Sequence, residues 1–172
     1  KLISKLVENI SFKKSLLISS TRVYEDSEEL INELSNVNSE DFRAKSLLES
    51  EAIYSKGINS SQKTIFRLSG LYDPEMKDKI FYKQVDEFQN KLIPISSNLN
   101  RLSRDQAARI IMNFCINKTD LLLLNVSEPT VLAQERFKML FPEKNFDDFF
   151  RIDNPGKQLN ISNLLNSKLL DG

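Results

Sequence analysis

The stretch that decides the fold is Ser15-Leu16-Leu17-Ile18-Ser19-Ser20-Thr21. Its apolar centre has no polar face, which is typical of a buried parallel strand rather than an alternating, half-exposed one. Two more segments of this kind follow, at residues 63–68 and 119–126. We therefore predict that residues 16–19, 64–67 and 121–125 are neighbouring parallel strands of one sheet.

Segments with helical periodicity separate these strands, a pattern that predicts βαβ units with right-handed crossovers. One helix is expected over residues 40–56, with Ser39 as its N-cap and Gly57 at its end. Another is expected over residues 104–116, with Ser103 as its N-cap. The other predicted elements are helices at 1–10, 28–34, 75–90, 129–141 (opened by Pro129) and 162–170, a short strand at 156–159, loops at 69–74 and 145–154, and a segment at 91–100 that is either irregular or a short strand.

The composition of the 172 residues excludes several kinds of chemistry. There is no His, which rules out a Ser-His-Asp system and His-ligated zinc, and we expect no metal site. The single Cys115 cannot form an internal disulfide, so it fits a reducing, cytoplasmic location; its apolar surroundings predict that it is buried. Equal numbers of basic and acidic residues, 24 each, predict no nucleic-acid partner. The apolar runs are too short to cross a membrane.

The three predicted strands make a small sheet with an exposed edge. The first strand is apolar on both faces and needs a neighbour on each side. We expect a preceding chain segment or another chain to complete the sheet. The four glycines lie too far apart for a phosphate-binding glycine-rich turn.

Residues 18–24 (ISSTRVY) resemble the SS-x-x-VY strand end of extended and atypical short-chain dehydrogenase/reductases, the NAD(P)-binding family of nucleoside-diphosphate-sugar epimerases and dehydratases. Further segments resemble motifs of the same family in the same order: residues 67–74 (RLSGLYDP), 100–108 (NRLSRDQAA), 124–129 (LNVSEP) and 156–159 (GKQL).

The resemblance implies an α/β fold, a partial Rossmann-like parallel sheet with flanking helices that lacks the N-terminal glycine-rich βαβ half. Residues 1–172 would form the C-terminal portion of one such domain. Residues 1–72 and 119–141 would supply the core, and residues 73–118 and 142–172 the substrate side. The implied ligands are NAD or NADP and a nucleotide-sugar-like small molecule.

The resemblance also assigns site residues by matching positions. Ser20 matches the catalytic hydroxyl; Tyr24, Arg67, Tyr72 and Arg101 would bind substrate; Ser19, Ser20 and Gly70 would bind the cofactor. Ordinary structural roles remain open beside these. The Ser20 hydroxyl could accept from loop backbone, and Arg67 could pair with a carboxylate.

The family's Tyr-x-x-x-Lys motif is missing, because no Tyr in the sequence has Lys four residues later. If Glu51 matches the glutamate of the family's helix motif, Arg43 stands in place of the Tyr and Leu47 in place of the Lys. Tyrosine-based catalysis is thereby placed in doubt. Two functions remain open: an epimerase-like protein acting on a nucleotide sugar, and a non-catalytic relative that serves as a ligand sensor or interaction scaffold.

Overall fold

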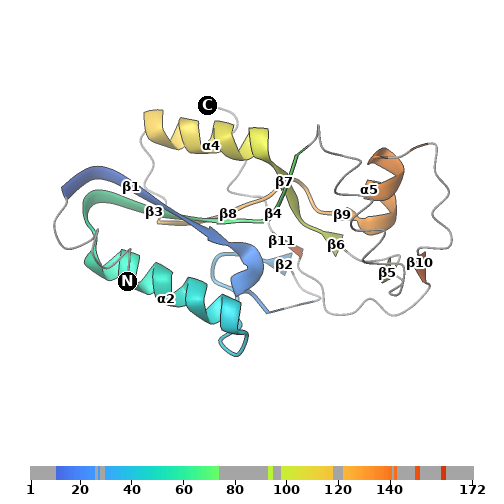
Figure 1. Ribbon diagram of the computed structural model, residues 1–172, viewed down its shortest axis with the longest axis horizontal. Coiled ribbons are helices and arrows are strands. Elements are labelled where there is room, and N and C mark those ends of the chain that lie inside the picture. The colour runs from blue at the N-terminus through green and yellow to red at the C-terminus, as the bar shows by residue number, and fades with distance from the viewer. Residues whose placement is uncertain are drawn as a thin grey trace.

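The computed structural model describes residues 11–25, 27, 30–73, 93–94, 98–117, 122–140, 142, 150–151 and 160–161. Its centre is a three-stranded parallel sheet with one long helix on each face (Figure 1). The helices predicted over residues 1–10, 75–90 and 162–170, and the strand over 156–159, lie outside the described residues. The division into core and substrate-side parts stays a prediction.

The sheet confirms the strands expected from the sequence. β1 (Ser11–Ser20), β3 (Asn59–Leu68) and β8 (Leu123–Val126) are parallel in the order β1-β3-β8. The first two are longer than predicted, because their ladder continues through the polar residues before each apolar run. β8 begins later than expected, at Leu123, because Leu122 is in an exposed bend.

Helix α2 (Phe42–Gly57) covers one face of the sheet. Its N-cap is Asp41, whose Oδ1 accepts a hydrogen bond from the Ala44 N–H at 2.8 Å. The prediction of Ser39 as the cap is therefore wrong by two residues. The same bond is the main reason that the pKa of Asp41 is lowered. Gly57, predicted to stop the helix after residue 56, is its last residue, and Ile58 is the C-cap.

Helix α4 (Arg104–Ile116) covers the opposite face, with the bounds and the Ser103 N-cap that the sequence predicts. Its inner side carries Ala107, Ile110 and Phe114. Cys115 is the next residue around the helix and is exposed, so the prediction of a buried cysteine is wrong. The continuous apolar run around Cys115 suggested burial, but the helical period places Cys115 on the outer side of α4.

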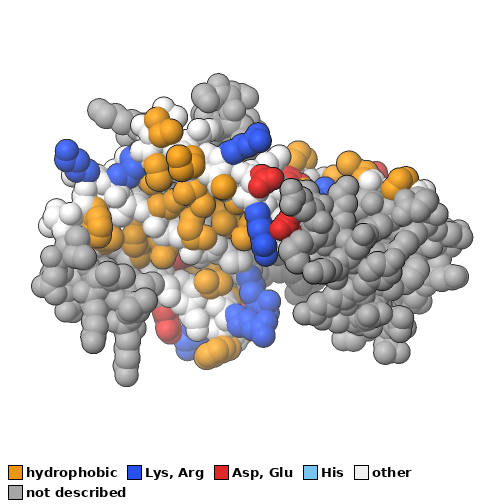
Figure 2. Space-filling view, turned by 45° about the horizontal axis from the view of Figure 1, so that its top comes forward, with side chains coloured by type: hydrophobic (Ala, Val, Ile, Leu, Met, Phe, Trp, Pro, Cys, Tyr) orange, Lys and Arg blue, Asp and Glu red, His pale blue; other side chains and the backbone are white. Residues whose placement is uncertain are grey.

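The main core lies between α4 and the sheet. Phe66 and Phe114 meet edge to face, with ring centroids 5.4 Å apart. The cluster comprises Phe66, Leu68, Leu102, Ala107, Ile110, Phe114, Leu124 and Val126. A smaller cluster of Val23, Tyr24 and Ile31 lies beyond the carboxyl end of β1. Figure 2 shows other hydrophobic side chains on the surface of the part that carries the sheet.

Several short elements differ from the prediction. The segment expected as a helix at 28–34 contains the strand β2 (Leu30–Ile31), which pairs with β11 (Asn160–Ile161). The expected loop at 69–74 contains β4 (Gly70–Tyr72), which pairs in parallel with β7 (Arg101–Ser103). These pairings join segments distant in sequence, which local patterns do not reveal.

The helix expected to open at Pro129 begins four residues later. β9 (Val131–Leu132) comes first and pairs with β6 (Asn98–Leu99), and α5 (Ala133–Leu140) follows. The segment 91–100 holds β6 and β5 (Ile93–Pro94), where the sequence left irregular structure or a short strand open. β5 pairs with β10 (Phe150–Arg151), within the stretch expected as a loop. Among the described helices, none is both long and apolar enough to span a membrane.

Candidate functional site

The predicted site residues gather where β1, β3 and β8 end. In parallel sheets of this kind, ligands bind beyond the carboxyl ends of the strands. The register places Ser19 beside Arg67 and Arg67 beside Asn125, so three polar residues form one row across the sheet. All three are buried.

The centre of this row is a buried ion pair between Arg67 and Glu51 of α2. Arg67 donates from Nη2 to Glu51 Oε2 at 2.6 Å and from Nε to Oε1 at 3.0 Å. The Ser19 hydroxyl donates to the same Oε1 at 2.5 Å. Burial alone would lower the pKa of Arg67, but its hydrogen bonds to Glu51 and Tyr24 outweigh burial and raise it. The predicted alternative role of Arg67, pairing with a carboxylate, is confirmed.

Tyr24 joins this network from the other side. Arg67 Nη1 donates to the phenol oxygen at 2.8 Å, and the phenol donates to Asn125 Oδ1 at 2.7 Å. Burial raises the pKa of Tyr24, and the neighbouring guanidinium of Arg67 offsets this only in part. The phenol therefore keeps its proton at neutral pH. Its side chain, 3% exposed, is a buried member of the network rather than a lining group.

Ser20 has the structural role that the sequence left open. It is the N-cap of the short 3-10 helix η1 (Thr21–Val23), and its hydroxyl accepts from the Arg22 N–H at 3.2 Å. The side chain is partly exposed at the strand end. Ser20 can thus both cap the turn and face a ligand, and a catalytic role stays a prediction.

The match of Glu51 to the family's glutamate, which stays a prediction, would place the family's tyrosine and lysine positions on helix α2. The Glu51–Arg67 ion pair turns Glu51 toward the sheet. One turn earlier, Leu47 packs against the cluster around Val23. Arg43 is exposed. An aliphatic contact therefore stands where the resemblance would require an ammonium group.

A second polar cluster surrounds Glu128, just after β8. The Tyr72 phenol donates to both carboxylate oxygens, at 2.9 and 3.0 Å, and the Ser103 N–H donates to Oε1 at 2.9 Å. Arg136 of α5 lies 3.5 Å from Glu128 Oε2 and 4.5 Å from the centroid of the Tyr72 ring. Burial, together with Glu128, raises the pKa of Tyr72 against the opposing effect of Arg136. Tyr72 is therefore a neutral hydrogen-bond donor that positions this cluster.

Arg101 and Gly70, which sequence reasoning assigned to substrate and cofactor, lie against each other. They are partners in the β4–β7 pair. A Cβ added to Gly70 would meet Arg101 Nη1 at 2.8 Å, so a larger residue here would displace the flexible end of the Arg101 side chain. Burial, and secondarily the charge of Arg136, lowers the pKa of Arg101.

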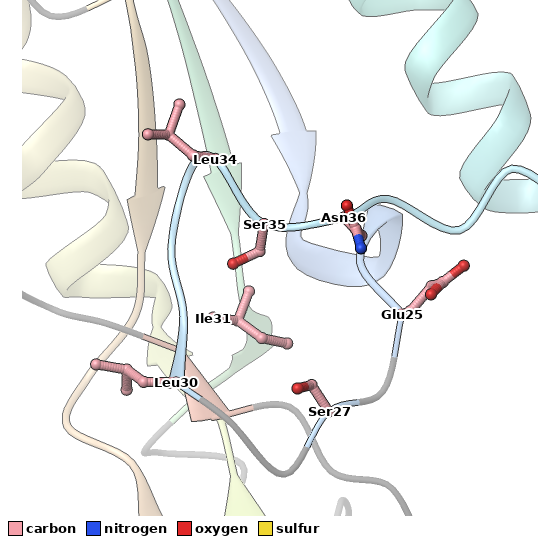
Figure 3. A pocket seen from close by; sticks show the side chains of 7 residues that line it. All are labelled: Glu25, Ser27, Leu30, Ile31, Leu34, Ser35 and Asn36. Carbon is pink, nitrogen blue, oxygen red and sulfur yellow. The ribbon is translucent and has the colours of Figure 1, made fainter.

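A pocket of about 290 Å³ follows η1 in the loop after β1 (Figure 3). The loop curves around Ile31 of β2, and Ser27, Ser35 and Glu25 are among the residues that line the pocket. Its lining comprises Glu25, Ser27, Leu30, Ile31, Leu34, Ser35 and Asn36. The same loop reaches the sheet through Glu33, whose Oε1 accepts from the Asn125 N–H at 2.8 Å.

Sequence reasoning missed Asn125, Glu33, Glu128 and the pocket. For Asn125 there was a signal, since a lone amide inside the apolar run 121–126 needs a partner when buried. Even here its Nδ2 is buried without a partner in the described part of the chain. Glu33, Glu128 and the pocket gave no signal, because their contacts depend on how distant segments meet.

The three residues expected to hold the nicotinamide cofactor each have a neighbour within the chain. Ser19 is bonded to Glu51, Ser20 caps η1, and Gly70 is exposed with the Arg101 guanidinium beside it. Ser20 and Gly70 keep an exposed part at this edge, and the assignment of the three residues to a dinucleotide stays a prediction. No cluster of acidic, Cys or His side chains suited to a metal occurs within the described ranges.

Comparison with known proteins shows the fold. No family profile and no curated protein matches the sequence. Among solved structures, UDP-glucuronic acid 4-epimerase from Bacillus cereus with NAD superposes with a TM-score of 0.73 at 17% identity, over 99% of this chain and 60% of the epimerase. RMD from Pseudomonas aeruginosa with NADPH gives 0.62 at 15% identity, over 92% and 59%.

A Methylobacillus flagellatus protein described as an NAD-dependent epimerase/dehydratase gives a TM-score of 0.61 at 23% identity, over 92% of this chain and 57% of its own. The α/β fold with its parallel sheet is thus that of Rossmann-like epimerases and dehydratases, as the sequence predicted. The chain spans less than two thirds of the length of these structures.

Proposed function

We propose that this chain is the C-terminal portion of an epimerase/dehydratase-like protein of the short-chain dehydrogenase/reductase superfamily. Its role in the proposal is to bind a nucleotide-sugar-like molecule beyond the carboxyl ends of β1, β3 and β8, without tyrosine–lysine catalysis. Support comes from the shared fold and from the B. cereus epimerase, whose solved complexes contain NAD and UDP-glucuronic acid.

The observation that carries the proposal is Leu47. Catalysis in the resembled family needs a lysine to lower the pKa of a tyrosine that then acts as general base. Here the matching position packs into an apolar cluster, and the matching tyrosine position holds the exposed Arg43. Tyr24 cannot substitute, because burial raises its pKa and its proton is donated to Asn125.

In this proposal the buried network supports the site, and partly exposed side chains contact the ligand. The buried Ser19–Glu51–Arg67–Tyr24–Asn125 network fixes the strand ends and the start of the loop after β1. The groups left partly exposed at this edge include Ser20, Tyr72 and Arg101. These are the side chains that we assign to ligand contact. A dinucleotide, NAD or NADP, is part of the proposal by resemblance only, with Ser19, Ser20 and Gly70 as the residues that the resemblance assigns to it.

The alternative is an active enzyme in which Ser20 orients the substrate for a base not identified among the described residues. Isothermal titration of the full-length protein with UDP-glucuronic acid, with and without NAD⁺, tests binding. We expect saturable binding that Ser20→Ala weakens. The control Ser46→Ala, on the exposed side of α2, leaves the affinity unchanged. Absence of binding to UDP-glucuronic acid, UDP-glucose and UDP alike would contradict the proposal.

A further inference from the structure

Glu128, just after β8, joins three other elements at the edge where the strands end. Its carboxylate oxygens lie 2.9 and 3.0 Å from the Tyr72 phenol of β4, and its Oε1 lies 2.9 Å from the Ser103 nitrogen of β7. Its Oε2 lies 3.5 Å from the Arg136 guanidinium of α5. The side chains of Glu128 and Arg136 are only 13% and 15% exposed, so water screens their attraction little. One largely buried carboxylate therefore ties β4, β7 and α5 to the end of β8.

The contact of Glu128 with β7 copies that of a neighbouring strand. In a parallel ladder, a residue donates its N–H to one carbonyl of the next strand, and its own C=O accepts from the N–H two positions further on. Glu128 donates its N–H to the Arg101 carbonyl oxygen at 2.8 Å, and it accepts from the Ser103 N–H with Oε1 in place of a backbone oxygen. Its backbone oxygen accepts from the Ser127 hydroxyl at 2.9 Å. Glu128 therefore fixes the backbone of β7 at both ends, including the position from which the Arg101 side chain extends.

The same carboxylate sets the direction of the Tyr72 ring. Glu128 holds the phenol end of the ring, and the Arg136 guanidinium lies 4.5 Å from the ring centroid. Tyr72 and Ser103 are also register partners in the β4–β7 pair, so the carboxylate bonds to two neighbouring positions of one ladder. The orientation of Tyr72 and the backbone position of Arg101 thus depend on one residue.

We propose that Glu128 is the positioning residue of the ligand edge, and that it acts through Tyr72 and Arg101 without touching the ligand. The inference rests on the proposed function, which assigns those two side chains to ligand contact. It adds the residue on which their placement depends, and it makes the reach of that side chain, rather than its charge, the decisive property. Side chains from separate strands bind a ligand well only when supporting contacts hold them in place.

Titration of the full-length protein with UDP-glucuronic acid, with urea denaturation of the same samples, tests the inference. Glu128→Ala removes every side-chain bond and should weaken binding about 10- to 100-fold, an effect typical of residues that orient ligand-contacting groups. Glu128→Gln keeps the reach and an acceptor for the Ser103 N–H, so it should retain most of the affinity. Glu128→Asp keeps the charge beside Arg136 but is too short to reach both Tyr72 and Ser103, so it should bind nearly as weakly as Glu128→Ala.

The matched control is Glu135→Ala. Glu135 is another carboxylate that accepts from a backbone N–H, that of Leu132 at 3.2 Å, but this bond lies at the start of α5. Its loss should leave the affinity for UDP-glucuronic acid unchanged. Wild-type affinity in folded Glu128→Ala, even with a lower urea midpoint, would show a merely structural role and overturn the inference. Tighter binding by Glu128→Asp than by Glu128→Gln would also overturn it, and this comparison decides the matter if Glu128→Ala does not fold.

Amide hydrogen exchange at Ser103, followed by NMR without any ligand, distinguishes this inference from the proposed function. Exchange should be faster in Glu128→Asp than in the wild type and unchanged in Glu135→Ala. If the wild type binds neither UDP-glucuronic acid nor UDP, but Ser103 exchanges faster in Glu128→Asp, the proposed function fails and the placement of β7 by Glu128 stands. If UDP-glucuronic acid binds equally to wild type and Glu128→Asp, the inference fails and the proposed function stands. If the wild type binds neither compound and exchange is unchanged, both are wrong.

Discussion

Arg67 is the residue on which the buried network depends, because it bonds to both Glu51 and Tyr24. Removing one partner of a buried ion pair leaves the other charge uncompensated. We predict that Glu51→Gln lowers the free energy of unfolding by about 3–5 kcal/mol, measured by urea denaturation. The control Arg22→Gln breaks an exposed pair with Asp41 at 3.6 Å and should leave the urea midpoint nearly unchanged. Equal midpoints for Glu51→Gln and wild type would contradict this account.

The raised pKa of Tyr24 predicts how the stability of the protein depends on pH. Its pKa in the folded state is raised above the ordinary value of 10.0, mainly by burial. The folded protein then holds the phenolic proton more tightly than the unfolded chain does. Its contribution to stability is full below about pH 10 and is lost as the pH rises through the folded-state pKa.

We therefore expect the free energy of unfolding to fall above about pH 10, and to fall less steeply in Tyr24→Phe. Urea midpoints measured across this range provide the test. Tyr72, whose pKa is also raised, contributes in the same direction in both proteins and leaves a residual slope. Identical pH profiles for wild type and Tyr24→Phe would show that the phenol is not held as described.

At the scale of elements, the N-cap of α4 gives the clearest prediction. The Ser103 hydroxyl accepts from the Gln106 N–H at 3.2 Å, and the residue is 5% exposed. Ser103→Ala should cost about 1 kcal/mol of stability, the usual value for a lost cap. Ser39→Ala, at an exposed serine that the sequence suggested as a cap but that α2 does not use, should cost nothing measurable. The reverse result would mean that the helix starts are misplaced.

The sequence predicted those elements that depend on local patterns. The three strands were found because apolar, hydroxyl-bounded runs are typical of buried parallel strands, and α4 because Ser103 precedes a periodic helix. β2 and β4 were missed because each depends on a partner far along the chain. The motif resemblance predicted that Ser19, Tyr24 and Arg67 lie at one edge of the sheet. Their contact with Asn125 could not be predicted, because it depends on how β8 pairs with β3.

For the molecule as a whole, the notable feature is the outer side of β1, where no strand of the described ranges pairs with it. β1 is an end strand of the described sheet, and Ile18 near its carboxyl end is 45% exposed. Unpaired strand edges with apolar side chains promote association. We predict that the 172-residue chain alone self-associates or binds a hydrophobic dye strongly, as measured by light scattering and dye fluorescence. A monodisperse monomer with a cooperative melt would contradict the prediction that another segment or chain completes the sheet.

The central claim is that a nucleotide sugar is bound here without tyrosine–lysine catalysis. Proton NMR of UDP-glucuronic acid, incubated with the full-length protein and NAD⁺, tests it most directly. The account predicts that the sugar signals broaden or shift on binding while the sugar stays chemically unchanged. Accumulation of an epimerised or dehydrated sugar beyond the molar amount of protein, abolished by Tyr24→Phe, would contradict it.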